Sequence, residues 1–499
     1  MRVSYLCLFV WIQFICPALC TEYLISLKTP KTLKYLFNFK LGGSTVKDLI
    51  ESKIHREFSF GNFNAISVDI PPLVAEKLKD IPFISDVVAN TKISLFDAFP
   101  EMEASLKGSN KLTKGKDKKT MFIDDGEDDD DESVEDGLEF KENYTSQKSA
   151  PRHLARISRR TQLPIIPQDY DTSALKYHYH ADRQGEDVHV YVLDSGINYS
   201  HPDFEGRAKE GIDTTGEGSG DFIGHGTHVA GLIGSKTYGV AKKANIYEVK
   251  VLDSLGRGNV TDIIEGLEYV VSQCQDNKKK CVVNMSLGAP GTHSILDRAV
   301  SAVIDEGIVV VVAGGNSGLN ACWYSPAKVK KAITVAAMDD RTDLMAQFSN
   351  WGACVDIWAP GVNVESLSNR GDDTVTLSGT SMASPIVAGA AALFLDQGYK
   401  PSEVRKALLK YSTKGVFKKR ALAVRPRSPN RLLYTGNNEK DDSFEYGLFP
   451  QIDEYKFISR LQEDTKDFNE SNDPNSALLI RGRKLLEPNL TFKSKKQVK

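Results

Sequence analysis

Five apolar runs of strand length constrain the fold of this chain more than any other feature of its sequence. Strands that are buried on both faces of a parallel sheet have this nearly uninterrupted apolar pattern. Segments of helix length, among them VTDIIEGLEYVVSQC and ILDRAVSAVIDEG, separate several of the runs. The alternation predicts an open parallel α/β sheet with helices on both faces and with ligands at the carboxyl ends of the strands. The runs are DVHVYVLD, NIYEVKVLD, CVVNMSLG, GIVVVVAGG and AITVAA.

The segments that precede this α/β region, which we place at residues 150–437, differ from it in composition. A chain of 499 residues is too long for one ordinary core, so more than one folded unit is expected. Residues 21–100 alternate short strand and helix patterns and predict a small α+β unit. Residues 101–149 include Asp124–Asp136, where ten of thirteen residues are acidic, and this block favours a disordered linker over a cation or partner site.

The two ends of the chain predict a secreted protein with a disordered tail. Residues 1–20 have one early Arg and a short apolar run, which favours a signal peptide removed near Cys20 over a membrane anchor. We find no later segment that is long and apolar enough to cross a bilayer. Residues 438–499 predict a polar, mostly disordered tail with one helix near 452–463. The net charge of −3 gives no reason to expect nucleic acid or an anionic membrane as a partner.

Cysteines and glycosylation sequons support the secretory route. Four cysteines follow the signal peptide, an even number that predicts two disulfides. Cys274 and Cys281 flank a short connection and either form a local bridge, which we favour, or stay as free thiols. The sequon at Asn284 lies in an apolar strand, so we do not expect its modification. The expected glycosylation sites are Asn143, Asn198, Asn259, Asn469 and Asn489.

Three short segments in the α/β region carry residues that can do chemistry. Asp194 ends the strand VYVLD, His225 lies in GHGTHVAG, and Ser381 precedes the helix-like run of LSGTSMASPIVAG with Pro385 in its first turn. A Ser hydroxyl becomes a nucleophile when an imidazole takes its proton, and a carboxylate must orient that imidazole. Alternatively, His225 and His228 together could bind a metal, and each segment alone could be structural.

Five motifs in order, DSGIN, GHGTHVAG, NMSLG, VAGGN and GTSMASP, resemble the subtilisin-like serine proteases. Within them the chain is similar to the proteinase K and cerevisin branch of fungi, over about Tyr23 to Gly436. The resemblance implies a subtilisin-like α/β fold behind an inhibitor-like propeptide at 21–100 of ferredoxin-like α+β fold. It also implies that Asp194 orients the imidazole, that His225 is the general base, and that Ser381 is the nucleophile.

The resemblance implies further roles in the substrate cleft. Asn316 of VAGGN is expected to donate its side-chain amide to the oxyanion. One substrate-binding edge is expected at Ser286, Leu287 and Gly288, the other at Gly256 and Gly258, and Gly314 is expected to line the cleft. Two departures from the family pattern alter this cleft, and these are Ala289-Pro290 after Gly288 and Gly314 in VAGGN.

The resemblance also implies features that stabilise the fold and features that indicate a branch of the family. Cys322 and Cys354 occupy positions where relatives carry a disulfide. Asp356 matches a position where relatives bind a structural calcium ion, whereas catalysis itself needs no cofactor. Ile386 lies where the family usually has a His that is not part of the triad. The local sequence resembles a sporulation-associated, spore-wall branch of yeast subtilases.

The leading hypothesis is a serine endopeptidase made as a secreted zymogen, cut within the linker at 101–149, and inhibited by its own propeptide until then. Its partners would be protein or peptide substrates, and we expect a monomer in the extracellular space, the cell or spore wall, or the vacuole. One alternative is a subtilase-shaped binding or wall-structural protein with little proteolysis. Another is a zinc hydrolase that uses His225 and His228.

Overall fold

The computed structural model describes residues 21–29, 32–41, 44–50, 53–95, 143–164, 172–275 and 279–436. The chain divides into two units, and all described residues belong to the one made of Met1–Ala98 and Glu135–Asp441. The signal peptide, most of the linker and the C-terminal tail with its expected helix lie outside the described residues. Within the described part, no helix is long and apolar enough to span a bilayer.

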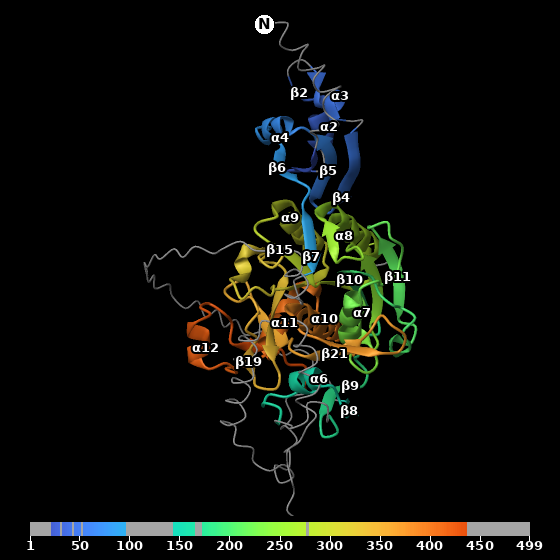
Figure 1. Ribbon diagram of the computed structural model, residues 1–499, viewed down its shortest axis with the longest axis vertical. Coiled ribbons are helices and arrows are strands. Elements are labelled where there is room, and N and C mark those ends of the chain that lie inside the picture. Colours follow the sequence, from blue (N-terminus) through green and yellow to red (C-terminus); the bar gives the residue numbers. More distant parts are fainter. Residues whose placement is uncertain are drawn as a thin grey trace, which may run out of the picture. The chain divides into compact units, whose positions relative to one another are not determined.

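The predicted parallel sheet is the centre of the molecule (Figure 1). Neighbouring strands are parallel from β11 to β24, and only the edge strand β23 and the short strand β19 beside β18 pair antiparallel. The five apolar runs form β10, β12, β14, β16 and β18, as the sequence predicts. The strands, in sheet order, are β11 (Ala208–Asp213), β12 (Asn245–Lys250), β10 (Val188–Asp194), β14 (Lys280–Met285), β16 (Val309–Ala313), β18 (Ile333–Asp339), β20 (Ile357–Pro360), β24 (Arg431–Leu432) and β23 (Thr413–Lys414), with β19 (Leu344–Met345) beside β18.

Helices cover both faces of this sheet. Along β10, Val190 and Val192 belong to one buried cluster, whereas Tyr191 and Leu193 belong to the other. The first cluster contains residues of α7 (His225–Gly234), α10 (Thr380–Asp396) and α11 (Pro401–Tyr411). The second contains residues of α8 (Val260–Gln275) and α9 (Ser294–Asp305). Burial on both faces explains why the strands lack alternation.

Helix α10 is buried over its whole length, which fits its apolar composition. Its first residue is Thr380, so the helix begins earlier than the sequence analysis assumed. The expectation that Pro385 lies in the first turn is therefore wrong, because Pro385 is the sixth residue of the helix. Ile386 is fully buried in the core.

The residues expected to form an α+β unit do so. Strands β4, β5, β1 and β6 form an antiparallel sheet in that order, and helices α2, α3 and α4 contribute to its buried core. This unit comprises β1 (Thr21–Leu27), α2 (Thr32–Asn38), β2 (Lys40–Leu41), β3 (Ser44–Thr45), α3 (Val46–Ile50), β4 (Ile54–Phe60), β5 (Phe63–Ile70), α4 (Pro72–Lys79) and β6 (Ile84–Ala89).

The strand that follows β6 joins the two parts of the chain. Strand β7 (Lys92–Leu95) lies between β13 (Arg257–Asn259) and β15 (Leu287–Pro290), and β15 pairs in turn with β17 (Tyr324–Ser325). All three pairings are antiparallel. The segment from the N-terminal unit therefore completes a four-stranded sheet with strands of the α/β region (Figure 1).

The last residues of the expected linker are ordered. Strand β8 (Tyr144–Lys148) pairs with β9 (Lys176–His180), so the disordered linker cannot extend to residue 149 as predicted. No apolar pattern indicates this strand in the sequence, because β8 is polar and only partly buried. The remaining elements are α6 (Arg152–Ile157), η3 (Pro202–Phe204), η4 (Ala321–Trp323), β21 (Val364–Leu367), β22 (Thr374–Leu377) and α12 (Lys419–Ala423).

Candidate active site

Asp194 and His225 form a buried pair at the carboxyl end of strand β10. Asp194 is the last residue of β10 and His225 the first of α7. The Nδ1 atom of His225 lies 2.7 Å from Oδ1 of Asp194, which also accepts the Ser195 N–H. Gly226 makes this approach possible, because a Cβ at that position would lie 2.0 Å from the Gly196 carbonyl oxygen.

The pairing sets the protonation of His225. Burial lowers the pKa of this imidazole, but the Asp194 carboxylate raises it by charge and hydrogen bonding, and the net result is a pKa above the ordinary value of 6.5. With the Nδ1 proton donated to Asp194, the neutral ring has its lone pair on Nε2. That atom is buried and has no hydrogen-bond partner among the described residues, so it is available as a base.

Ser381 is the second residue of α10, where backbone N–H groups at the helix start have no intrahelical partners. Its hydroxyl donates to the carbonyl oxygen of Ser286 at 3.2 Å. The structure thus joins Asp194 to His225 and Ser381 to Ser286, but it shows no hydrogen bond between His225 and Ser381. Catalytic hydrogen bonds often form only once the substrate is bound.

Asn316 follows β16 and reaches the start of α10. Its Oδ1 atom accepts the backbone N–H of Thr380 at 2.9 Å and the Thr380 hydroxyl at 2.8 Å. Its Nδ2 atom lies beside Gly379, 3.2 Å from where a Cβ of that residue would be. The Thr380 hydroxyl in turn accepts the Gly315 N–H at 3.0 Å. The amide of Asn316 is therefore fixed next to Gly379, the residue that precedes Thr380 and Ser381.

The two expected substrate edges face each other across β7. Leu287 pairs with Leu95, and Gly288 pairs with Ser94. On the other side Gly258 pairs with Ile93, and Gly256 accepts the Leu95 N–H at 3.2 Å. Gly258 cannot carry a side chain here, because its Cβ would lie 2.0 Å from the Val251 carbonyl oxygen.

The altered cleft residues have other neighbours. Ala289 and Pro290 of β15 pair with Ser325 and Tyr324 of β17. One further strand therefore adjoins this side of the cleft. Gly314 donates its N–H to the Val335 carbonyl oxygen, at the end of β16.

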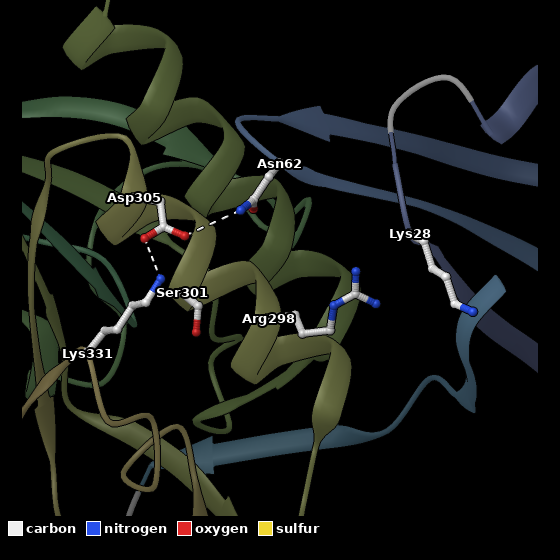
Figure 2. A pocket seen from close by; sticks show the side chains of 6 residues that line it. All are labelled: Lys28, Asn62, Arg298, Ser301, Asp305 and Lys331. Carbon is white, nitrogen blue, oxygen red and sulfur yellow. Dashed lines mark hydrogen bonds and ion pairs between the residues drawn. The ribbon is translucent and has the colours of Figure 1, made fainter. Parts of the chain in front are cut away.

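Polar contacts hold the N-terminal unit against α8 and α9. The Arg298 guanidinium donates to the Ser26 hydroxyl at 2.8 Å and to the Leu27 carbonyl oxygen at 3.1 Å. Glu268 accepts the Ser59 N–H, and Arg56 pairs with Glu265. Figure 2 shows a pocket of about 300 Å³ here, in which Asp305 binds Asn62 and Lys331.

His228 has a structural role in this fold. It is fully buried, and its Nε2 lies 3.0 Å and 3.1 Å from the carbonyl oxygens of Val364 and Val375. Burial and the neighbouring His225 lower its pKa to about 3, so the ring is neutral. Because Asp194 and these carbonyls hold the two imidazoles separately, the arrangement gives no support to a zinc site. No group of three potential metal ligands occurs in the part of the chain that the structure describes.

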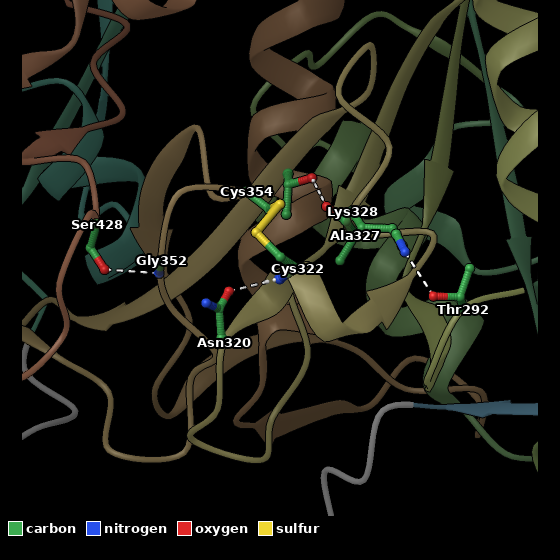
Figure 3. The surroundings of a disulfide bond; sticks show 9 residues. Thr292, Asn320, Cys322, Ala327, Lys328, Gly352, Cys354 and Ser428 are labelled. Carbon is green, nitrogen blue, oxygen red and sulfur yellow. Dashed lines mark hydrogen bonds between the residues drawn. A yellow bond between two sulfur atoms is a disulfide. The ribbon is translucent and has the colours of Figure 1, made fainter. Parts of the chain in front are cut away.

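Both expected disulfides are present. Cys322 is bonded to Cys354, where the Asn320 side chain caps the Cys322 N–H (Figure 3), and Cys274 is bonded to Cys281. Asp356 lies close by in sequence, and its carboxylate is fully engaged. One oxygen accepts the Thr334 N–H and the other accepts Nε of Arg405 at 3.0 Å. Calcium binding at Asp356 stays a prediction, and it would require Arg405 to release the carboxylate.

The described sequons differ in accessibility. Asn143 is exposed, whereas Asn198 and Asn259 are partly buried and Asn284 is fully buried. Asn259 donates to Asp262 and lies in the β13 ladder. Glycosylation of these asparagines stays a prediction, and Asn469 and Asn489 lie outside the described residues.

Two participants of the site were missed from the sequence. Thr380 fixes the Asn316 amide, and the signal for it was its position next to the expected nucleophile. The strand β7 that fills the cleft had only a strand-like pattern, which cannot show where the strand pairs.

The fold and this site define a class of enzymes, the subtilisin-like serine proteases. The chain belongs to the subtilase family, whose model, described as "Subtilase family", matches residues 185–447.

One relative extends this match over nearly the whole chain. The chain is 40% identical to the subtilase-type proteinase RRT12 of Saccharomyces cerevisiae, over 94% of this chain and 92% of that protein. It is 43% identical to cerevisin of the same yeast over 60% of this chain and 49% of cerevisin. The crystal structure of a cold adapted subtilisin-like serine proteinase matches with a TM-score of 0.51 and 37% identity, covering 58% of this chain and all of that one.

Proposed function

We propose that Asp194, His225 and Ser381 form the catalytic triad of this serine protease. The observation that carries the proposal is the 2.7 Å contact of the buried Asp194–His225 pair, made at the carboxyl edge of the sheet. Ser381 stands at the start of a helix that packs in the same core as α7. This arrangement supplies a base, a group that orients it, and a nucleophile at the N-terminal, positive end of a helix dipole.

The reaction then follows from these positions. The Ser381 hydroxyl turns from the Ser286 carbonyl oxygen to Nε2 of His225, gives up its proton there, and bonds to the carbonyl carbon of the substrate. The oxyanion receives hydrogen bonds from Nδ2 of Asn316 and from the backbone at the start of α10. His225 passes the proton to the leaving amine. A water molecule then gives a proton to His225 and attacks the acyl carbon. The bond between that carbon and the Ser381 oxygen breaks, and His225 returns the proton to this oxygen, which restores the hydroxyl.

We propose that substrates bind as an extended peptide in place of β7. The edges at Gly256–Gly258 and Leu287–Gly288 pair through the backbone, which gives affinity without a strict sequence requirement. Ile93 of β7 is fully buried against the second core cluster, so an apolar substrate residue at the equivalent place is favoured.

The position of β7 also supports the zymogen proposal and indicates a first bond to be cut. The ladder pairs Ser94 with Gly288 and Leu95 with Leu287, and the next residue of the α/β region is Ser286, whose carbonyl oxygen accepts the Ser381 hydroxyl. The register of β7 therefore runs toward Ser286 as the strand ends at Leu95. We therefore propose that the first maturation cut follows Phe96 and that a later cut falls within the linker.

A single expression experiment tests both proposals. The full chain is expressed beside Ser381→Ala and a control, Ser158→Ala, in which a buried hydroxyl remote from the site is removed. We expect the wild type and the control to react with a fluorophosphonate and to yield a new amino terminus at Asp97, and Ser381→Ala to do neither. Absence of labelling in the wild type would refute the triad. Labelling with a first cut elsewhere would refute the Phe96 bond alone.

We also propose that the protein acts after secretion, as a monomer, on proteins outside the cell, in the wall or in the vacuole. The two disulfides and the signal-like N-terminus support the secretory route. Two observations support a role in spore-wall formation. They are the sequence of Ser384–Val387 and the similarity to a yeast proteinase. If Ser381→Ala restored a deletion strain as well as the wild type, the alternative of a wall-structural protein would be favoured.

A further inference from the structure

A chain of three hydrogen bonds runs between two residues of α10 by way of the sheet. The Ser384 hydroxyl donates to Oδ1 of Asn284 at 2.8 Å, and Nδ2 of Asn284 donates to the Ser286 hydroxyl at 3.0 Å. The Ser286 hydroxyl donates to the carbonyl oxygen of Ser381 at 3.0 Å. All four residues are completely buried.

The Ser381 carbonyl needs this partner because of Pro385. In a regular helix the carbonyl of residue 381 would accept the N–H of residue 385, four positions later. Pro385 has no N–H, and a proline ring also pushes away the carbonyl four residues before it. The first turn of α10 is therefore not closed by the backbone at the nucleophile, and the Ser286 hydroxyl supplies the missing donor.

Ser286 connects the nucleophile to the substrate edge. Its side chain holds the Ser381 carbonyl, while its own carbonyl accepts the Ser381 hydroxyl, and it directly precedes β15. Any shift of the Ser286 side chain thus moves the nucleophile relative to the strand that pairs with the peptide. Asn284, the last residue but one of β14, fixes that side chain and takes its own orientation from Ser384.

We infer that Asn284 and Ser384 are positioning residues that set the place of Ser381 through the hydroxyl of Ser286. The inference rests on the proposed role of Ser381 as nucleophile. Neither residue is expected to touch the substrate. Because water cannot reach this chain of bonds to replace a lost member, removal of one hydroxyl leaves the next side chain without its orienting partner.

A positioning role and a purely structural role predict different effects on the rate constant of the chemical step. A structural polar network would lower stability and leave the rate constant of the folded fraction unchanged. A positioning network lowers the chemical rate, since misplacement of a reacting group by about 1 Å can cost about 100-fold. Peptide binding depends on the backbone of β13 and β15, so KM should change little.

The experiment uses the full chain with Ser384→Ala, Asn284→Ala, Ser384→Thr and the control Ser158→Ala. We expect Ser384→Ala to lower kcat and the rate of fluorophosphonate labelling by about tenfold or more, with KM changed by less than about twofold. Ser384→Thr, which keeps a hydroxyl, should retain most of the labelling rate. Ser158→Ala, which removes a buried hydroxyl bonded to the Ala155 carbonyl, should lower only the melting temperature.

The remaining outcomes are equally decisive. Ser384→Ala and Asn284→Ala combined should lower kcat no more than the larger single effect, because both break one chain. Wild-type labelling rates in Ser384→Ala and Asn284→Ala at temperatures where both are folded would overturn the inference. A labelling rate in Ser384→Thr as low as that in Ser384→Ala would also overturn the inference. Failure of the wild type itself to label would instead refute the nucleophile assignment.

Discussion

At the scale of single residues, Thr380 fixes the orientation of the Asn316 amide. Both the N–H and the hydroxyl of Thr380 donate to Oδ1, so that oxygen is turned toward α10 and Nδ2 lies beside Gly379. An amide without such partners could present its oxygen to the developing negative charge and repel it. The orientation is thus set before substrate binds, which is the condition for effective electrostatic stabilisation.

This geometry predicts the effect of removing the amide. Asn316→Ala should lower kcat by about 100- to 1000-fold with little change in KM, because the donor acts on the oxyanion and not on the bound peptide. Steady-state kinetics on a peptide substrate measure both constants. Thr380→Val, which keeps the shape but loses the hydroxyl that orients the amide, should give a smaller loss. An increase of KM with unchanged kcat in Asn316→Ala would contradict the assignment.

The Asp194–His225 pair predicts a pH profile. The pKa of His225 is raised above 6.5, so the protonated ring predominates below that pKa and the base is lost; kcat/KM should rise as the pH increases through it and then level off. Asp194→Asn removes the raising charge and leaves the effect of burial, so the midpoint of the residual activity should move to lower pH, with about a 10,000-fold lower rate. A midpoint that moved upward would contradict this reading. His228, with its pKa near 3, should add no step above pH 4.

At the scale of elements, the pairing of β13 depends on a glycine. A Cβ at Gly258 would lie 2.0 Å from the Val251 carbonyl oxygen, so Gly258→Ala must displace β13 from the position in which it pairs. We expect KM for peptides to rise and kcat to fall less, because the strand is proposed to bind the peptide and carries none of the proposed reacting groups. The neighbour Arg257→Ala, whose side chain is exposed, is the matched control. Equal effects of the two substitutions would contradict the pairing.

The sequence predicts elements better than it predicts their contacts. The five apolar runs became the central strands because burial on both faces favours apolar residues at most positions of strands such as β10 and β14. The polar strand β8 left no such signal, and neither did the insertion of β7 between two distant edges, because backbone pairing is independent of side-chain type. Pro385 was misplaced because the sequence permits more than one helix start before it.

The same limit applies to the site. Five ordered motifs indicated Asp194, His225 and Ser381, and the structure brings the first two into contact. The bond of Arg405 to Asp356 and that of Ser384 to Asn284 join residues 49 and 100 positions apart in the chain, and no local pattern links them. Side-chain orientation, which decides such contacts, depends on packing between elements.

At the scale of the whole molecule, the contact of α9 with the N-terminal unit predicts how long the proposed inhibition would outlast the proposed first cut. Arg298→Ala removes two charge-assisted hydrogen bonds to Ser26 and Leu27, worth about 1.5–3 kcal/mol each at most. The cleaved unit should dissociate about tenfold more easily or more, and activity toward an added peptide should appear sooner. Lys331→Ala, at the same pocket but bonded only to Asp305 among the contacts described, is the control. Identical time courses for all three proteins would contradict the role of Arg298.

If β7 leaves after the proposed cut, the edges of β13 and β15 that now pair with it would lie unpaired on the two sides of a slot. Only a segment that is extended, and freed from its own hydrogen bonds, can fill such a slot from both sides. A folded protein would therefore have to open locally before it could enter. We expect the rate at which this enzyme digests folded proteins to follow the free energy of their local unfolding more closely than their amino-acid sequence.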